Sequence, residues 1–240
     1  MPCGPYIGPM HQSVTLIFHK PFGVLSQFTP GTHAGEYRTL RDFGPFPPDV
    51  YPVGRLDADS EGLLILTNDR ALTRRLLEPV FAHPRTYLVQ VEGVPDPAAL
   101  RRLSGGTLVL HGHPLRPAAV RLLDADPDLP PRPVPIRFRK NIPTAWIELT
   151  IFEGKNRQVR RMTAAAGHPT LRLFRISIGP LSVEGLPPGK WRALSIPESA
   201  RLQTMLRVRA DANAGRPVRG GAAPSAGRRR TGRPHRPGRG

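Results

Sequence analysis

Short apolar runs separated by connectors rich in proline and glycine limit what this chain can fold into. β-Branched or alternating runs occupy residues 13–19, 51–56, 63–67, 86–92, 107–111, 120–123, 144–152 and 171–178. Runs this short, bounded by Gly and Pro, predict strands rather than helices. Helical spacing is confined to short segments that begin near Asp69, Asp96, Asn156 and Glu198. Because the predicted strands outnumber the helices and most are near enough along the chain to pair antiparallel, we expect an α+β fold.

The two ends of the chain differ in composition from the middle. Residues 1–12 are rich in Gly and Pro, and residues 207–240 hold ten Arg, one Asp and almost no apolar bulk. Such segments cannot bury a core, so we expect a disordered lead-in (1–12), a folded body (13–206) and a disordered basic tail (207–240). The tail has a net charge of +9, which leaves +8 of the total +17 on the rest of the chain. A basic body as well as a basic tail indicates a polyanionic partner.

Several classes of protein are excluded by what the sequence lacks. Cys3 is the single cysteine, so an internal disulfide and a cysteine-based zinc site are both ruled out. The N-terminal residues do not have the basic start and apolar run of a signal peptide. No apolar stretch reaches the ~20 residues that a membrane-spanning helix needs. We therefore expect a soluble, cytoplasmic protein.

The segment Gly54–Leu64, GRLDADSEGLL, is the densest polar cluster between apolar runs, in a place where reactive groups are common. Its acids, Asp57, Asp59 and Glu61, allow three interpretations. They are solvated turn acids, or they bind calcium with the spacing of half an EF-hand loop, or one of them is a nucleophile or base beside Arg55. Calcium is disfavoured because the twelfth position of the loop is Asn68 instead of a bidentate Glu, and the flanks resemble strands.

The catalytic interpretation points to a particular kind of reaction. A carboxylate suits attack at the anomeric carbon of a sugar, as glycosidases show. Glycosidases need two carboxylates and a water. A single acid without water suits a rearrangement in which the leaving base is recaptured.

The segment Glu153–Gly167, EGKNRQVRRMTAAAG, places four cations where a predicted strand gives way to a predicted helix. One interpretation is an exposed basic helix face. However, cations in the first turns of a helix oppose the helix dipole unless an anion is bound there. The start of a helix already favours phosphate, and arginine strengthens that preference. The segment therefore favours an anion-binding function.

Three separated motifs, GRLD…GLL, the strand TYLVQVE after Arg85, and EGKNRQVRRM, resemble the pseudouridine synthases that modify ribosomal RNA, in the group typified by the small-subunit enzyme. Arg85 stands where relatives often carry Lys, a departure that we expect to be harmless. The resemblance implies the pseudouridine synthase catalytic fold over residues 13–206, with a mixed, mostly antiparallel sheet, flanking helices and two sub-lobes around a central cleft. Only residues 1–12 precede the first predicted strand, so we expect no N-terminal RNA-binding domain of the kind that many relatives carry.

The stretches VLSQFT (Val24–Thr29) and RKNIPTAW (Arg139–Trp146) are similar to members that act on the large ribosomal subunit. The resemblance thus implies isomerisation of a specific uridine in 23S rRNA, within structured RNA or a partly assembled subunit. It implies a monomer that needs no metal, nucleotide or redox cofactor.

The resemblance also implies roles for individual residues. Asp57 is expected to be the catalytic carboxylate, kept ionised by an ion pair with Arg160. Tyr87 is expected to stack on the flipped uracil over an apolar floor formed by Leu173, and Arg55 to fill the gap left in the RNA stack. A larger set is expected to bind RNA, mainly at phosphates, which position the substrate without reading its sequence: Lys20, Lys155, Asn156, Arg157 and Arg161.

One alternative function uses the same basic surface without chemistry. A non-catalytic RNA-binding or ribosome-assembly protein also needs Lys and Arg, but it has no use for Asp57. The two functions are therefore separated by the effect of replacing that acid.

Overall fold

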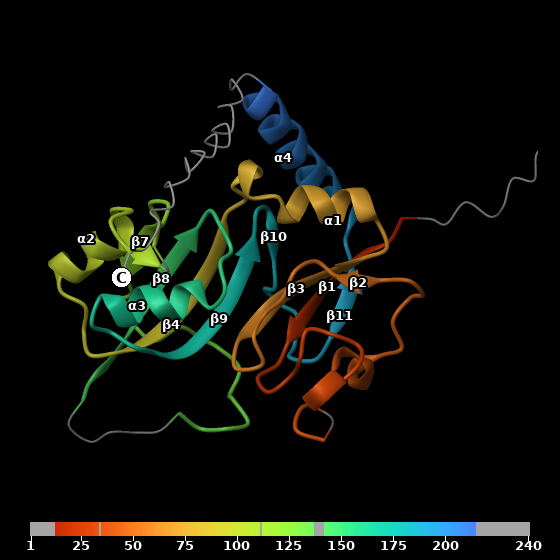
Figure 1. The fold of residues 1–240 in the computed structure, drawn as a ribbon. Coiled ribbons are helices and arrows are strands. Elements are labelled where there is room, and N and C mark those ends of the chain that lie inside the picture. The colour runs from red at the N-terminus through yellow and green to blue at the C-terminus, as the bar shows by residue number, and fades with distance from the viewer. Residues whose placement is uncertain (1–12, 34, 111, 137–141, 215–240) are drawn as a thin grey trace, which may run out of the picture.

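The structure is a computed structural model that describes residues 13–214 except residues 34, 111 and 137–141. Its described residues form a nine-stranded sheet with the order β11-β1-β3-β9-β4-β8-β7, in which β2 also pairs with β3 and β10 with β9. The strands of this sheet are β1 (Thr15–Lys20), β2 (Tyr51–Pro52), β3 (Glu61–Thr67), β4 (Arg85–Glu92), β7 (Ala119–Leu122), β8 (Thr144–Ile151), β9 (Thr170–Ile178), β10 (Leu181–Ser182) and β11 (Trp191–Ala193). A separate small hairpin consists of β5 (Val109–Leu110) and β6 (His113–Pro114). Figure 1 shows the large sheet running across the whole molecule.

One parallel contact joins the two halves of this otherwise antiparallel sheet. β3 pairs with β9 in parallel at Glu61↔Phe174 and Gly62↔Arg175. Gly62 has φ +101°, and a Cβ at this position would lie 2.3 Å from the backbone oxygen of Arg175. Only glycine permits so close an approach of the two strands. Gly62 therefore helps to bring the acidic segment before β3 against β9.

The helices begin where the sequence carries capping residues. The side chain of Asp69 accepts a hydrogen bond from the backbone N–H of Leu72, and that of Asp96 accepts one from Ala99, as expected for N-caps. These bonds start α1 (Arg70–Leu77) and α2 (Pro97–Ser104). The other helices are α3 (Gln158–Ala165), α4 (Ile196–Ala214) and the short 3₁₀ turns η1 (Gly31–His33), η2 (Leu40–Phe43) and η3 (Pro79–Phe81).

Separate hydrophobic clusters hold the helices on the sheet. Side chains of α1 and α4 pack into a cluster with Leu88 and Phe174, whereas α2 and α3 pack into a second cluster with Val89 and Leu173. Successive residues of a strand point to opposite faces of the sheet. Leu88 and Val89 are successive on β4, and Leu173 and Phe174 on β9, so the two clusters lie on opposite faces. In Figure 1, α1 and α4 lie at one end of the sheet, and α2 and α3 at the other.

Most predicted elements appear within one to three residues of their expected bounds, and the α+β class is confirmed. Two boundaries were wrong: the strand expected over residues 51–56 ends at Pro52 as β2, and the helix expected to end near residue 207 is longer. α4 continues past Leu206 to Ala214, because Leu202 and Leu206 are buried against the sheet and the alanine-rich residues that follow sustain helix. The expectations for residues 1–12 and for the tail from residue 215 lie outside the described residues. Within the described part of the chain, no helix is both long and apolar enough to span a bilayer.

Candidate active site

A pocket of about 450 Å³ lies where the loop before β3, the strands β4 and β9, and the start of α3 meet. Its walls contain side chains of both hydrophobic clusters, such as Ile65 and Leu173. Its polar lining is unequal in charge: among the described residues Asp57 is the one carboxylate, against five cations. These cations are Arg55, Arg85, Lys155, Arg157 and Arg175. The pocket is therefore suited to an anionic ligand that presents one reacting centre to one acid.

Asp57 sits in a loop that the protein holds from behind. The hydroxyl of Ser26 donates to the backbone oxygen of Leu56 (2.8 Å) and accepts from its N–H (3.0 Å). The backbone N–H of Gly23 donates to the oxygen of Ala58 (2.8 Å). The loop closes on itself through the N–H of Ser60, which donates to the oxygen of Asp57 (3.0 Å). With its backbone fixed in this way, Asp57 directs a side chain that is 37% exposed towards the pocket.

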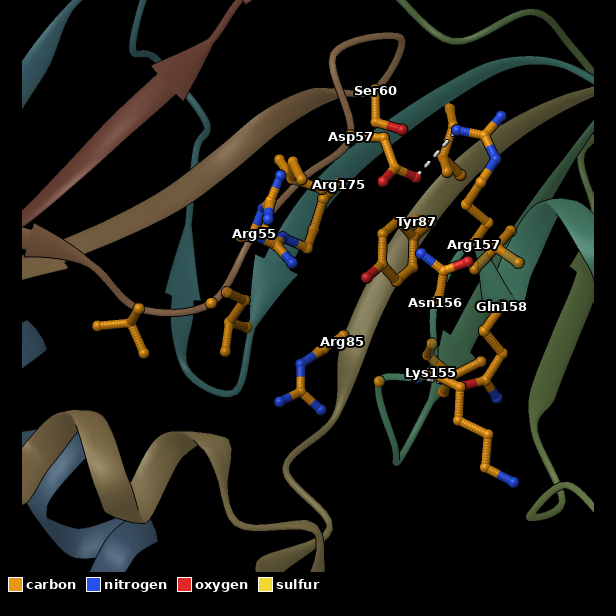
Figure 2. A pocket seen from close by; sticks show the side chains of 18 of the residues that line it. Arg55, Asp57, Ser60, Arg85, Tyr87, Lys155, Asn156, Arg157, Gln158 and Arg175 are labelled. Carbon is orange, nitrogen blue, oxygen red and sulfur yellow. Dashed lines mark hydrogen bonds and ion pairs between the residues drawn. The ribbon is translucent and has the colours of Figure 1, made fainter. Parts of the chain in front are cut away.

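The expected ion pair between Asp57 and Arg160 is not the one that forms. Oδ2 of Asp57 lies 3.3 Å from Nη1 of Arg157, a contact drawn in Figure 2. Arg160 instead donates from Nη2 to the backbone oxygen of Asp59 (2.7 Å), and its Nε lies 3.4 Å from Oδ2 of the same residue. Within the described residues, Arg160 has no ion pair with Asp57. Its guanidinium is therefore a support of the loop that carries Asp57.

Arg157 has an unusual backbone conformation at the start of α3. Arg157 is the N-cap residue of α3 and has φ +48° and ψ +34°, a left-handed conformation that non-glycine residues rarely adopt. Left-handed residues of this kind gather at functional sites, where the surrounding structure holds them. A bidentate contact holds Arg157 in place: its guanidinium donates to both carboxylate oxygens of Asp59, at 3.2 and 2.8 Å.

Asp57 and Asp59 share Arg157 as a partner, whereas Glu61 pairs with a different arginine. Burial alone raises the pKa of Asp59, but the hydrogen bonds from Arg157 and the charge of Arg160 more than offset this, so the pKa lies below its usual value. Glu61 is buried in β3 and accepts two hydrogen bonds from Arg172, at 2.9 and 2.8 Å. The described residues contain no group of three or more His, Cys, Asp or Glu side chains able to hold a metal ion. Of the three acids, Asp57 is the one that lines the pocket.

Tyr87 and Leu173 lie together in the pocket as the sequence predicted. Tyr87 on β4 is opposite Arg175 on β9, and Val89 is opposite Leu173. Residues two apart on a strand share a face, so Tyr87, Leu173 and Arg175 point to the same side of the sheet. Tyr87 and Leu173 are both 6% exposed and line the pocket. They provide a flat aromatic ring beside an apolar floor.

Five of the residues expected to bind RNA lie at the pocket or next to it. Arg55, Lys155, Asn156 and Arg157 are exposed at the pocket, and Arg161 is half-buried nearby and donates to Oδ1 of Asn156 (2.9 Å). The Arg55 side chain has no hydrogen bond or ion pair with any described residue. Figure 2 shows Arg55 and Arg157 on opposite sides of Tyr87.

Lys20 does not belong to this group, and its expected role in phosphate binding was wrong. Its side chain is completely buried, and Nζ donates to the backbone oxygens of Val24 (2.6 Å), Pro21 (3.0 Å) and Ala58 (3.4 Å). Burial lowers its pKa to about 7, against the opposing influence of nearby carboxylates. Because β1 lies between β11 and β3 and its last residue is covered by the loop that follows it and by the loop of Asp57, this lysine faces the interior. It braces the loop of Asp57 from inside the protein.

Two arginines of the pocket were missed as site residues. Arg85 donates to the backbone oxygens of Leu76 (3.2 Å) and His83 (3.4 Å), and Arg175 lies opposite Tyr87. The signal for Arg175 was present in the sequence. It follows Leu173 at the two-residue spacing that places both side chains on one face of a strand. Of the stretch RKNIPTAW, residues 139–141 lie outside the described residues.

The chain is similar to known proteins both in sequence and in fold. Residues 14–165 match the family described as RNA pseudouridylate synthase. The chain is 54% identical over 177 residues to a protein of Xanthomonas campestris named ribosomal large subunit pseudouridine synthase E, which covers 74% of this chain and 93% of that protein. A Vibrio vulnificus protein of the same name is 50% identical over 182 residues, with 76% and 75% covered. A crystal structure described as pseudouridylate synthase superposes with a TM-score of 0.64 at 28% identity, over 80% of this chain and 74% of the other.

Proposed function

Because the chain belongs to the RNA pseudouridylate synthase family, we propose that it isomerises a specific uridine of 23S ribosomal RNA to pseudouridine. The family and the fold expected from the sequence motifs are confirmed. The choice of large-subunit RNA is supported by the names of the Xanthomonas and Vibrio relatives. A cytoplasmic location and action as a monomer on structured RNA or a partly assembled subunit complete the proposal.

The observation that carries the assignment is the lone carboxylate of a cationic pocket. A glycosidase would place two carboxylates around its bond, whereas Asp57 is the single acid among the described lining residues. One acid suffices when the leaving base is recaptured by the same sugar. The atoms balance without a co-reactant, because the bond from C1′ to N1 breaks, a bond from C1′ to C5 forms, and a proton passes from C5 to N1.

The chain's own residues supply the rest of the reaction. The target base must leave the RNA stack, at a cost of a few kcal/mol, before its glycosidic bond is accessible. Arg55 is free to enter the vacated space and to contact phosphate. Tyr87 and Leu173 hold the extruded uracil in an apolar slot that keeps water from the detached base. Asp57 serves in either route, attack at C1′ or removal of a sugar proton, from the same position.

Binding of the RNA backbone falls to the surface around the pocket. Lys155, Asn156, Arg157 and Arg161 surround the start of α3, where backbone N–H groups already favour an anion. In this proposal Arg157 exchanges one partner when RNA binds. Its contact with Asp57 is partly exposed, so a phosphate can replace Asp57 while the contact with Asp59 remains.

The decisive experiment is a map of pseudouridines in ribosomal RNA from cells with and without the protein. We expect one site, or a small set of sites, in 23S rRNA to lose pseudouridine in the deletion strain and to regain it on complementation. Complementation by the Asp57→Asn variant should not restore the site. If it does, the protein acts as a non-catalytic RNA-binding or assembly factor, and the catalytic proposal is wrong.

A further inference from the structure

Arg175 is a buried cation without a buried counter-charge. Its side chain is 4% exposed and lines the pocket, and its Nε donates to the backbone oxygen of Leu63 (2.8 Å). This is its one side-chain hydrogen bond to any described residue, and Nη2 is buried without a partner there. The described residues include no carboxylate within ion-pair distance of it. A guanidinium carries five N–H donors, so most of its capacity is unused.

Such an arrangement is costly unless a ligand completes it. Burying a charge without a partner is strongly unfavourable, and buried polar groups in proteins are nearly always hydrogen-bonded. Arg172, three residues earlier on β9, shows the usual solution: it is also buried, and it is paired with both oxygens of Glu61. The same strand therefore presents one satisfied and one unsatisfied arginine, and the unsatisfied one faces the pocket.

The position of Arg175 indicates which part of the substrate it meets. It is opposite Tyr87 in the sheet register and two residues from Leu173, the two side chains that form the slot for the base. In Figure 2 it lies on the same side of Tyr87 as Arg55, away from Asn156 and Arg157 at the start of α3. Phosphates are bulky and hydrated and suit the exposed cations, whereas a planar base can enter a slot between a ring and an apolar floor.

We propose that Arg175 donates a hydrogen bond to a carbonyl oxygen of the extruded uracil and stabilises the negative charge that the base acquires when it leaves the sugar. This inference rests on the proposed function. When the bond from C1′ to N1 breaks, its electron pair stays on the uracil and is shared between N1, O2 and O4. A fixed cation beside one of these oxygens is stabilising at that moment, more so in a site without water. The effect is the same whether Asp57 attacks C1′ or removes a sugar proton.

The experiment compares Arg175→Met with Arg172→Met, its neighbour on the same strand. Pseudouridine formation is measured in single turnovers with enzyme in excess over a 23S rRNA fragment, together with RNA affinity and melting temperature. For Arg175→Met we expect a rate constant about 10²-fold below that of the wild type, RNA affinity within about threefold, and a melting temperature no lower. For Arg172→Met we expect the opposite pattern, a clearly lower melting temperature and a nearly unchanged rate constant at a temperature where it is folded.

A second variant separates charge from folding. Arg175→Lys keeps the positive charge but loses the fork of donors, so we expect a rate constant between those of the wild type and Arg175→Met. A wild-type rate in Arg175→Met overturns the inference while leaving the proposed function intact. Loss of fold in both Arg175 variants overturns it too, because the residue is then structural. Absence of pseudouridine with the wild type itself would instead be the failure of the proposed function.

Discussion

Oδ2 of Asp57 lies 3.3 Å from Nη1 of Arg157, and the same guanidinium binds both carboxylate oxygens of Asp59. One arginine at the start of a helix thus holds two acids of a loop about a hundred positions earlier in the chain. Arg160, one turn further along α3, holds the backbone of that loop. The carboxylate that we propose as catalytic is therefore positioned by two arginines that act at different points, one at the side chains and one at the main chain.

Replacing Asp57 by Asn should separate catalysis from binding. The amide has the same shape but can neither attack a sugar carbon nor accept a proton, so pseudouridine formation should fall below detection. RNA affinity should stay within about threefold, because phosphate contacts supply most of it. The measurements are single-turnover assays and filter binding with the same RNA fragment. Turnover near the wild-type rate would contradict the catalytic role.

Arg157→Ala and Arg160→Ala should differ in severity. The Arg157 side chain is 40% exposed, and exposed ion pairs contribute at most about 1 kcal/mol, so we expect a rate loss of about fivefold or less. The Arg160 side chain is 13% exposed and donates a hydrogen bond to the main chain of the Asp57 loop, and a hydrogen bond from a charged group contributes about 1.5–3 kcal/mol, so we expect a loss of about 10-fold to 10²-fold. Single-turnover rate constants, measured on RNA at saturating enzyme, test whether Arg160→Ala loses more activity than Arg157→Ala. A larger loss in Arg157→Ala would show that its contact with Asp57 is the essential one.

Lys20→Met should change how stability depends on pH. Burial lowers the pKa of Lys20 to about 7 in the folded protein, below its ordinary value of 10.5. Between these values the unfolded chain holds more protons on this lysine than the native protein does, so the wild type gains stability as pH rises. The free energy of unfolding of the wild type relative to Lys20→Met should therefore increase with pH between about 7.5 and 9.5, by at most about 1.4 kcal/mol per pH unit.

Urea unfolding of both proteins across this pH range provides the measurement. Other titrating groups are common to the two chains and cancel in the difference. If the difference in unfolding free energy between the two proteins did not change with pH, the prediction that the pKa of Lys20 is lowered in the folded protein would be wrong. Lys20→Met should also slow pseudouridine formation, because the hydrogen bond from Nζ to the backbone oxygen of Ala58 in the Asp57 loop is lost.

Deletion of residues 215–240 should affect RNA binding without affecting the fold. The segment carries eight Arg and no acid, and it follows the end of α4 at Ala214. We expect an unchanged melting temperature and weaker RNA binding, most visibly at low salt. The slope of log affinity against log salt should become shallower by about 0.7–0.9 for each phosphate contact that is lost. A slope equal to that of the full chain would show that the segment takes no part in binding.

Much of this protein was readable from local features of its sequence. Strand runs, the caps Asp69 and Asp96, and the segment around Asp57 depend on residues close together in the chain, where period, turn chemistry and capping act. The pairing of Tyr87 with Leu173 in the pocket was also anticipated, through the resemblance of the motifs that carry them. These features follow from short-range physics or from a shared pattern.

The partners of the charged residues were decided only by tertiary structure. Whether Arg157 or Arg160 reaches Asp57 depends on how α3 meets a loop some hundred residues away, which in turn depends on the parallel contact of β3 with β9 at Gly62. The same long-range packing buries Lys20 under two loops and places no carboxylate of the described residues within ion-pair distance of Arg175. A charge has the same letter in the sequence whether it faces water, an acid or a pocket, and its chemistry is set by which of these the fold places beside it.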